Sequence, residues 1–303
     1  MRLVTFALPA DPTHRLGILE GDGTVRDLWD AAHHIGQPIP FDPGSMLSLI
    51  EAGPSALSDA RTLAADAPAR PLAELSILAP IPRPRKNVFC VGWNYLEHFE
   101  EGEKVRQTGL DHPKHPVFFS KAPTAVTGPF DPIPFDPAVS TRIDWEVELA
   151  VVIGRAGKNI QEADAFAHVF GYTVVNDVSA RDLQRRHGGQ WMKGKSLDGS
   201  CPMGPWIATA DEVNPDALRV ITRVNGVVKQ DASTRQIFFK IPRLLAELSL
   251  GMTLEPGDIL STGTPQGVGV AREPAEFLRP GDLLETEIVG LGCLRNRIGI
   301  PAR

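Results

Sequence analysis

The chain of 303 residues has only three cysteines, Cys90, Cys201 and Cys293, and no CxxC motif. Because an odd number of thiols cannot pair completely within one chain, we expect reduced cysteines and a cytoplasmic protein. No segment approaches the ~20 consecutive apolar residues that a membrane-spanning helix needs, so we expect no membrane association. The brief apolar segment at residues 1–9 lacks the longer apolar region of a signal peptide, and we interpret it as a first strand.

The chain also has fewer basic than acidic residues. The chain has 31 Lys and Arg residues against 37 Asp and Glu, which gives a net charge of −6. A nucleic-acid-binding protein usually needs a basic face, and only Arg181, Arg185 and Arg186 form a local basic cluster. We interpret this cluster as a solvated or substrate-facing helix and expect no nucleic-acid partner. An anionic substrate would have to meet a few locally placed cations.

Turn-forming residues are abundant, with 28 Gly and 27 Pro. Asp22-Gly23 and Asn225-Gly226 each separate two apolar segments, which predicts β-hairpins. Ser45 is a candidate N-cap for a short helix over residues 46–52. The Pro-rich segment around residues 80–84 predicts a stiff connector. We therefore expect a small N-terminal α+β domain over residues 1–75 and a catalytic domain over residues 85–303.

The second segment alternates mainly between strands and turns. Short apolar runs predict strands near residues 88–91, 147–153, 172–175 and 220–228. Ser179 and Asp182 have the spacing of a capping box, which predicts a helix toward residue 187. A second helix is expected over residues 242–250, with Pro242 in its first turn and Gly251 after its end. The predicted fold class is α+β with a sheet-dominated core.

Three carboxylates suggest a metal site. Glu146 and Glu148 lie two residues apart in a predicted strand, so their side chains share one face, while Trp145 and Val147 enter the core. On its own this pattern suits a solvent-exposed strand face at least as well. Asp177 follows another apolar strand and precedes the expected helix, where a carboxylate can reach into a site; an ordinary turn residue is the alternative. Three oxygen donors without a Cys–His set favour Mg²⁺ or Mn²⁺, with Ca²⁺ also compatible.

A histidine and a glutamate form a second candidate group. His98 lies three residues before Glu101, so the two are neighbours on a helical turn. A carboxylate beside imidazole orients the ring and raises its basicity, as in a general base. The segment over residues 98–115 is charged and poor in apolar residues, and we interpret it as a lid that orders over substrate. An ordinary surface histidine in a solvated loop is the alternative.

Residues 189–196 match the phosphate-loop pattern literally, but the context does not. A phosphate loop follows a strand and opens a helix, whereas a helix is expected before this segment. We therefore reject nucleotide binding and keep Lys195 as a cation that could stabilise an enolate or a carboxylate. The Gly- and Thr-rich segment over residues 261–269 could donate hydrogen bonds to a carboxylate, or could be an ordinary turn.

Taken together and in order, these motifs resemble the fumarylacetoacetate hydrolase family from about residue 85 to the C-terminus. The matching elements are Val91-Gly92-Trp93-Asn94-Tyr95 with His98 and Glu101, Glu146-Val147-Glu148, Asp177 with Ser179-Ala180-Arg181-Asp182, Gly194-Lys195-Ser196, and residues 262–269. Each motif is weak alone, but their ordered conjunction is specific. Residues 1–75 look like the smaller, variable N-terminal domain of many members.

The resemblance implies a β-rich mixed-sheet roll, a homodimer, and Mg²⁺ or Mn²⁺ on Glu146, Glu148 and Asp177. It also implies that His98 and Glu101 activate water from a lid. The positions that match substrate contacts are Lys195, Thr264, Gln184 and, less directly, Arg181. Gly188-Gly189 replaces a bulky contact residue of the hydrolase that names the family, so a shorter pyruvate-type substrate is expected.

Three functions fit these residues. The first is metal-dependent hydrolysis of a carbon–carbon bond in an acylpyruvate, for example fumarylpyruvate, with release of pyruvate. The second uses the same metal–enolate site for oxaloacetate decarboxylation or for isomerisation or decarboxylation of a 2-hydroxymuconate-type acid. The third is a non-catalytic binding module, because a fold alone does not prove chemistry. The first two share a small oxo-acid substrate, and we expect an enzyme.

Overall fold

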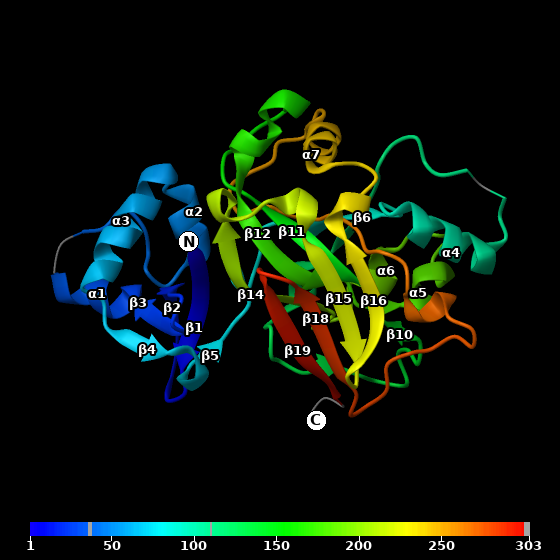
Figure 1. The fold of residues 1–303 in the computed structure, drawn as a ribbon, viewed down its shortest axis with the longest axis horizontal. Coiled ribbons are helices and arrows are strands. Elements are labelled where there is room, and N and C mark those ends of the chain that lie inside the picture. The colour runs from blue at the N-terminus through cyan, green and yellow to red at the C-terminus, as the bar shows by residue number, and fades with distance from the viewer. Residues whose placement is uncertain (36–37, 110, 300–303) are drawn as a thin grey trace.

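The computed structural model describes residues 1–35, 38–109 and 111–299 and shows an α+β fold around a large mixed sheet. This confirms the predicted fold class. The strand order of the main sheet is β4-β3-β2-β1-β14-β12-β11-β17-β6-β7, with β5 paired to β1 and β8 to β14. A second sheet has the order β16-β15-β18-β19-β9 and lies in front of the first in Figure 1.

The N-terminal unit contributes one end of the main sheet. Its strands are β1 (Arg2–Leu8), β2 (Asp11–Leu19), β3 (Thr24–Asp27), β4 (Ala69–Pro71) and β5 (Ser76–Ile77). Its helices are α1 (Leu28–Ile35), α2 (Met46–Glu51) and α3 (Pro54–Ala65). The β2–β3 hairpin is confirmed, as is the Ser45 cap, whose hydroxyl accepts a hydrogen bond from the Ser48 amide.

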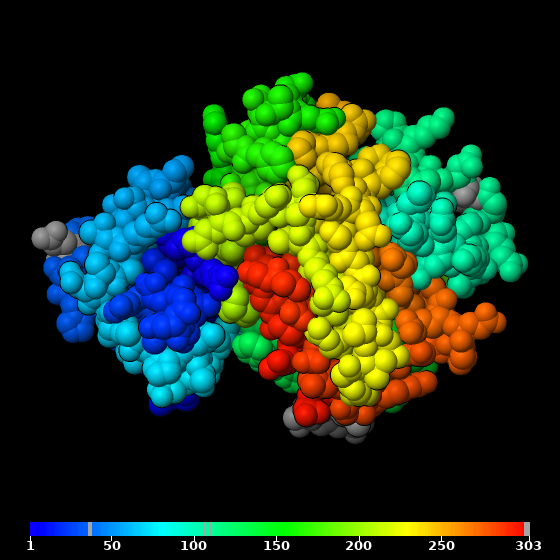
Figure 2. Space-filling model, in the orientation of Figure 1, coloured from blue at the N-terminus to red at the C-terminus, as the bar shows by residue number. Residues whose placement is uncertain are grey.

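In the space-filling view this unit forms a lobe, blue to cyan, beside the larger body (Figure 2). Its sheet is nevertheless continuous with the rest, because β1 pairs with β14 through Leu3 and Ile207. The division of the chain into domains at residues 75 and 85 stays a prediction.

The remaining strands of the main sheet come from the middle of the chain. They are β6 (Val88–Gly92), β7 (Val117–Lys121), β8 (Val126–Thr127), β11 (Val147–Ile153), β12 (Val169–Asn176), β14 (Cys201–Thr209) and β17 (Ile259–Ser261). β11 is buried along its whole length. Alternate residues enter two different hydrophobic cores, since Ala150 and Val152 pack with Ile207, whereas Leu149 and Val151 pack with Leu244. This period of two also sets the direction of the acidic residues at the start of the strand.

The second sheet and a small ladder complete the β structure. The strands are β9 (Ile133–Pro134), β15 (Arg219–Val224), β16 (Val227–Ser233), β18 (Leu283–Ile288) and β19 (Gly292–Gly299), and the ladder pairs β10 (Ile143–Asp144) with β13 (Ser179–Ala180). The predicted hairpin at Asn225-Gly226 joins β15 to β16, and both turn residues have the positive φ that a tight turn needs.

Four more helices surround the carboxyl-terminal part of the fold: α4 (Leu96–Arg106), α5 (Arg181–Arg186), α6 (Met192–Lys195) and α7 (Ile241–Ser249). Short 3-10 turns are η1 (Leu72–Glu74), η2 (Pro123–Ala125), η3 (Glu162–His168), η4 (Ala210–Glu212), η5 (Pro215–Ala217), η6 (Thr234–Gln236) and η7 (Gly269–Ala271). The helix predicted over residues 242–250 is confirmed as α7. None of the helices in the described part of the chain has the length and apolar character of a membrane span.

The predicted capping box at Ser179 and Asp182 is wrong. Ser179 lies in β13, paired with Asp144, and its hydroxyl donates to the carbonyl of Asp177. Helix α5 begins two residues later, and its N-cap, Ala180, has no side-chain hydrogen bond. Ser179 therefore pairs in the short β10–β13 ladder and does not form the helix cap that the sequence pattern predicts.

Candidate active site

The three predicted carboxylates meet at one point. One ligand oxygen from each of Glu146, Glu148 and Asp177 lies within 4.8 Å of the others, and all three residues are buried. Adjacent strands bring them together, since β11 and β12 pair antiparallel and the Asp177 amide donates to the Glu146 carbonyl at 2.9 Å. Asn176 adds a link, because its side-chain oxygen accepts from the Glu146 amide at 3.0 Å.

Buried cations surround two of these carboxylates. The Lys195 ammonium lies 2.6 Å from Glu146 Oε2 and 2.7 Å from Asp177 Oδ2. Lys121 donates to the other oxygen of Asp177 at 2.8 Å, and Arg181 reaches Glu146 Oε1 at 2.7 Å. Burial alone would raise the pKa of Glu146, but Lys195 and Arg181 outweigh burial and lower the pKa to about 2.

Glu148 has a different environment. Its Oε2 accepts hydrogen bonds from the Ser261 hydroxyl at 2.5 Å and from the Gly263 amide at 2.9 Å. Burial, followed by the charges of Asp177 and Glu146, raises the pKa of Glu148 well above its usual range. In the metal-free site Glu148 therefore favours its protonated form, whereas Glu146 beside Lys195 and Arg181 favours its ionised form.

The donor set fits a divalent cation. It consists of three buried carboxylates from two paired strands, all within reach of one ion, and carboxylate oxygens are the ligands that Mg²⁺ and Mn²⁺ prefer. A bound cation would also stabilise the ionised form of Glu148, so that metal binding displaces its proton. Glu146, Glu148 and Asp177 are the residues that would hold it.

The predicted histidine–glutamate pair is formed on α4. His98 Nδ1 lies 2.9 Å from Glu101 Oε1, and Glu101 Oε2 accepts from the Gly267 amide at 2.8 Å. A carboxylate accepts a hydrogen bond from a protonated Nδ1, and this tautomer leaves the lone pair on Nε2, which is then the basic nitrogen. The Gly- and Thr-rich segment is therefore the anchor of this pair as well as of Glu148.

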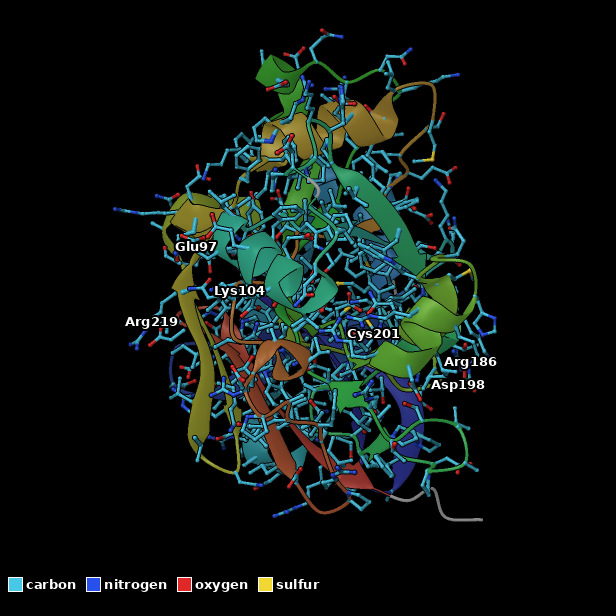
Figure 3. All side chains as sticks on the ribbon, turned by 90° about the vertical axis from the view of Figure 1, so that its right-hand side faces the viewer. Glu97, Lys104, Arg186, Asp198, Cys201 and Arg219 are labelled. Atoms are coloured by element: carbon cyan, nitrogen blue, oxygen red, sulfur yellow. The ribbon has the colours of Figure 1, made fainter. Side chains whose placement is uncertain are left out.

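Members of both groups line one cavity of about 130 Å³, but Asp177 and Glu101 lie behind its wall. His98, Glu146, Glu148 and Lys195 contribute to its wall, together with the predicted substrate contacts Arg181, Gln184 and Thr264. Figure 3 looks onto this side of the molecule, where α4, marked by Glu97 and Lys104, faces the viewer and α5, marked by Arg186, lies beside it.

An aromatic wall closes part of the cavity. Trp191 meets Trp93 and Phe119 edge to face, with ring centroids 4.9 and 5.2 Å apart. Gly92 makes room for the Trp191 ring, because a Cβ at Gly92 would lie only 2.3 Å from it. The space left beside the carboxylates suits a short substrate.

The predicted substrate contacts differ in how many of their hydrogen-bonding groups are already used by protein partners. Arg181 donates to Asp144 at 2.7 Å and to Gln184 at 3.2 Å, in addition to its ion pair with Glu146. Its guanidinium is thus held mainly by protein acceptors. The Thr264 hydroxyl accepts a hydrogen bond from Gln230 at 2.8 Å.

Three buried residues of this site were not predicted. Lys121 neutralises Asp177, Asp144 binds Arg181 and the amides of Gly269 and Val270, and Gln230 contacts Thr264. Asp144 precedes Glu146 by two residues, so the same strand period could have placed it. No local sequence pattern marks Lys121 or Gln230 as a site residue, because their partners are distant in sequence.

Comparisons with known proteins agree with this geometry. A family model for the fumarylacetoacetate hydrolase C-terminal domain matches residues 87–299. The chain is 44% identical over 301 residues to the human mitochondrial protein named oxaloacetate tautomerase FAHD2A, covering 98% of this chain and 91% of the relative. It is 43% identical over 296 residues to oxaloacetate tautomerase YisK of Bacillus subtilis strain 168, covering 94% and 96%.

Solved structures show the same fold over the whole length. A fumarylacetoacetate hydrolase from Exiguobacterium antarcticum superposes with a TM-score of 0.83 at 36% identity, covering 99% of this chain and 100% of the other. Maleylpyruvate hydrolase from Sphingobium sp. SYK-6, solved with manganese(II) and pyruvate, has a TM-score of 0.78 at 29% identity, with both chains fully covered.

Proposed function

The chain belongs to the fumarylacetoacetate hydrolase family, and from that membership we propose that it catalyses the metal-dependent keto–enol tautomerisation of oxaloacetate. The observation that carries the proposal is one small cavity lined by His98 and by Glu146 and Glu148, two members of the carboxylate triad. Relatives named for this reaction cover nearly the whole chain at 43–44% identity. The proposal takes up the oxaloacetate alternative in place of acylpyruvate hydrolysis.

The reaction moves one proton. The C3–H bond of the keto acid breaks, a double bond forms between C2 and C3, and the C2 oxygen takes up a proton. We assign proton removal at C3 to His98 Nε2, because Glu101 holds the opposite ring nitrogen. The ammonium of Lys195, between Glu146 and Asp177, offsets negative charge as it develops on the C2 oxygen.

We propose Mg²⁺ or Mn²⁺ on Glu146, Glu148 and Asp177. When bound, the ion would supply Lewis-acid polarisation of the oxo group. Thr264, Gln184 and Arg181 stay proposed substrate contacts. Homodimer formation and a cytoplasmic location also stay proposals, and the human relative carries a mitochondrial name.

Hydrolysis of an acylpyruvate is a second candidate. It is supported by the similarity to maleylpyruvate hydrolase. The His98–Glu101 pair also supports it, because it could remove a proton from a water molecule instead of from C3 of the substrate. The two reactions differ in whether the cavity admits a water molecule beside the substrate, and in whether a carbon–carbon bond breaks.

One assay separates the candidates. Enol-oxaloacetate is diluted into buffer with Mn²⁺-loaded protein, and the loss of the near-ultraviolet absorbance of the conjugated enol is followed. Parallel samples of oxaloacetate and fumarylpyruvate are analysed for pyruvate. We expect faster loss of the enol without pyruvate formation. Pyruvate from fumarylpyruvate with no acceleration of enol loss would instead identify a hydrolase, and pyruvate from oxaloacetate would identify a decarboxylase.

A further inference from the structure

A buried glutamine on the outer strand β16 connects the second sheet to the active site. The side-chain oxygen of Gln230 accepts from the Val147 amide at 3.1 Å and from the Thr222 hydroxyl at 2.8 Å. Its nitrogen donates to the Thr264 hydroxyl at 2.8 Å and to the Pro265 carbonyl at 2.9 Å. Gln230 is only 1% exposed, so every hydrogen-bonding position of the amide is used inside the protein.

Two backbone groups determine which way this amide points. The Val147 N–H can only donate, and the Pro265 carbonyl can only accept. A flipped amide would place two donors together at Val147 and two acceptors together at Pro265. The nitrogen of Gln230 must therefore face Thr264, independently of any choice about the hydroxyl hydrogens.

The direction of the amide determines the role of the Thr264 hydroxyl. Its oxygen accepts from Gln230, so its hydrogen is directed elsewhere. Within residues 1–35, 38–109 and 111–299, the structure shows no hydrogen bond donated by this hydroxyl. Thr264 lines the same cavity as His98 and Lys195. We propose that Gln230 is a positioning residue that holds the Thr264 hydroxyl as a donor to the carboxylate of the oxo-acid substrate.

The packing of the loop supports this coupling. Gly267 has φ +99°, and a Cβ there would lie 2.3 Å from the Lys229 carbonyl, so the loop rests directly on β16. The Gly267 carbonyl accepts from the Trp145 indole at 3.1 Å, and its amide donates to Glu101. The strand that orients Thr264 thus also supports the anchor of the histidine pair.

The proposal rests on the proposed function only in taking an oxo-acid as the ligand. A hydroxyl held as a donor favours an anionic oxygen, whereas one held as an acceptor would disfavour it. Binding of a carboxylate ligand can therefore test the role of Gln230 separately from turnover. Oxalate is a suitable probe because it presents adjacent oxygens, as a 2-oxo acid does.

The main variant is Gln230→Glu, which keeps the size of the side chain and the acceptor for Val147. The carboxylate would draw the Thr264 hydrogen toward itself and away from the ligand. We expect oxalate affinity for the Mn²⁺-loaded protein to fall about 10- to 100-fold, as for the loss of a hydrogen bond to a charged group. KM for oxaloacetate should rise similarly, with a smaller change in kcat, because the bond is made in ground and transition states alike.

A double-mutant cycle with Thr264→Val separates this effect from simple charge repulsion or loss of stability. In the Thr264→Val background the hydroxyl is absent, so Gln230→Glu should weaken oxalate binding less than about 2-fold further. Thr222→Val is the matched control, because it removes a hydrogen bond from the opposite side of the same amide. Val147 and Pro265 still orient Gln230 there, and oxalate affinity should stay within about 2-fold of the parent.

Isothermal titration with oxalate, Mn²⁺ affinity and thermal melting are measured for each variant. Effects that multiply in the double variant, at equal Mn²⁺ affinity, would overturn the positioning role. So would a Gln230→Glu protein that binds oxalate as the parent does. An inactive parent that shows the expected coupling in oxalate binding would reject oxaloacetate tautomerisation and leave the role of Gln230 intact. Gln230→Met provides an uncharged variant should Gln230→Glu fail to fold, and the same coupling with Thr264→Val is expected.

Discussion

The carboxylate triad and the His98–Glu101 pair both contribute to one cavity, through Glu146, Glu148 and His98, but are held by different kinds of structure. The triad sits at the ends of two paired, buried strands, and its side chains are at most 5% exposed. The pair sits on α4, where the side chains of His98 and Glu101 are 12% and 19% exposed. Strand pairing and buried lysines locate the triad, whereas the pair depends on one helix and on a hydrogen bond to Gly267.

From this difference we expect metal binding and proton transfer to be separable. The triad is organised before substrate arrives, because its oxygens are already fixed by Lys121, Lys195, the Ser261 hydroxyl and the Gly263 amide. The helix that carries the pair has few apolar residues, and Leu96 and Val105 are exposed on it. A change in the triad should therefore remove both metal and activity, and a change in the pair should remove activity alone.

The largest effect is expected from Asp177→Asn. This variant loses a metal ligand and the charge that partners Lys121 and Lys195, so Mn²⁺ affinity and enol conversion should both collapse. We expect a rate loss of at least about 1,000-fold, since Lewis-acid stabilisation contributes several kcal/mol. Mn²⁺ titration and the enol assay measure the two losses. Asp164→Asn, an exposed site in η3, is the control, and normal Mn²⁺ affinity in Asp177→Asn would place the metal elsewhere.

The protonation of Glu148 provides the next test. Burial and the neighbouring Asp177 and Glu146 charges raise its pKa well above the model-peptide value of 4.5. The metal-free folded protein therefore keeps a proton that the unfolded chain releases near pH 4.5, and folding stability falls as pH rises from there toward the raised pKa.

Metal binding needs the carboxylate, so it should release up to about one proton and strengthen as pH rises. Titration calorimetry with Mn²⁺ in buffers of different ionisation enthalpy measures that proton. The melting temperature of metal-free protein should fall with pH across the same window, and Glu148→Gln should flatten this slope. A slope unchanged in Glu148→Gln would mean that another group carries the proton.

Both groups could be predicted from sequence, the pair from the spacing of His98 and Glu101 on one helical turn. The period of a strand places Glu146 and Glu148 on one face, and the end of β12 places Asp177, so local rules sufficed once β11 and β12 paired. The two predicted hairpins and the Ser45 cap were recovered for the same reason. Those rules act over a few residues and need no knowledge of the tertiary fold.

The residues that escaped prediction depend on tertiary contacts. Lys121 is the last residue of β7, where the sequence alone suggests a surface lysine. Its partner Asp177 is 56 residues away, so only the tertiary fold reveals the buried ion pair. Gln230 is the one buried residue of the outer strand β16, and its contact Thr264 is 34 residues away. The Ser179 cap failed because β13 pairs with β10, a ladder of two residues with no sequence signature.

His98→Ala is expected to remove the base of the His98–Glu101 pair and to leave the carboxylate triad intact. Loss of a general base costs about 10²- to 10⁴-fold in kcat. Mn²⁺ affinity should be unchanged, because His98 is not one of the residues that meet at the triad. His115→Ala is the matched control, since that histidine is 72% exposed and pairs only peripherally with Glu247. Weakened Mn²⁺ binding in His98→Ala would show that the two groups are not separable.

Glu101→Gln should have the smallest effect and reports on orientation of the base. The carboxylate accepts from both His98 and the Gly267 amide, whereas an amide has one acceptor and would turn its NH₂ toward one of these donors. We expect kcat to fall about 10-fold, as for one lost charge-assisted hydrogen bond, with Mn²⁺ affinity unaltered. Glu100→Gln, on the exposed face of the same helix, should be neutral in both assays. A similar loss in both variants would mean that the charge of α4, and not the contact between Glu101 and His98, supports the reaction.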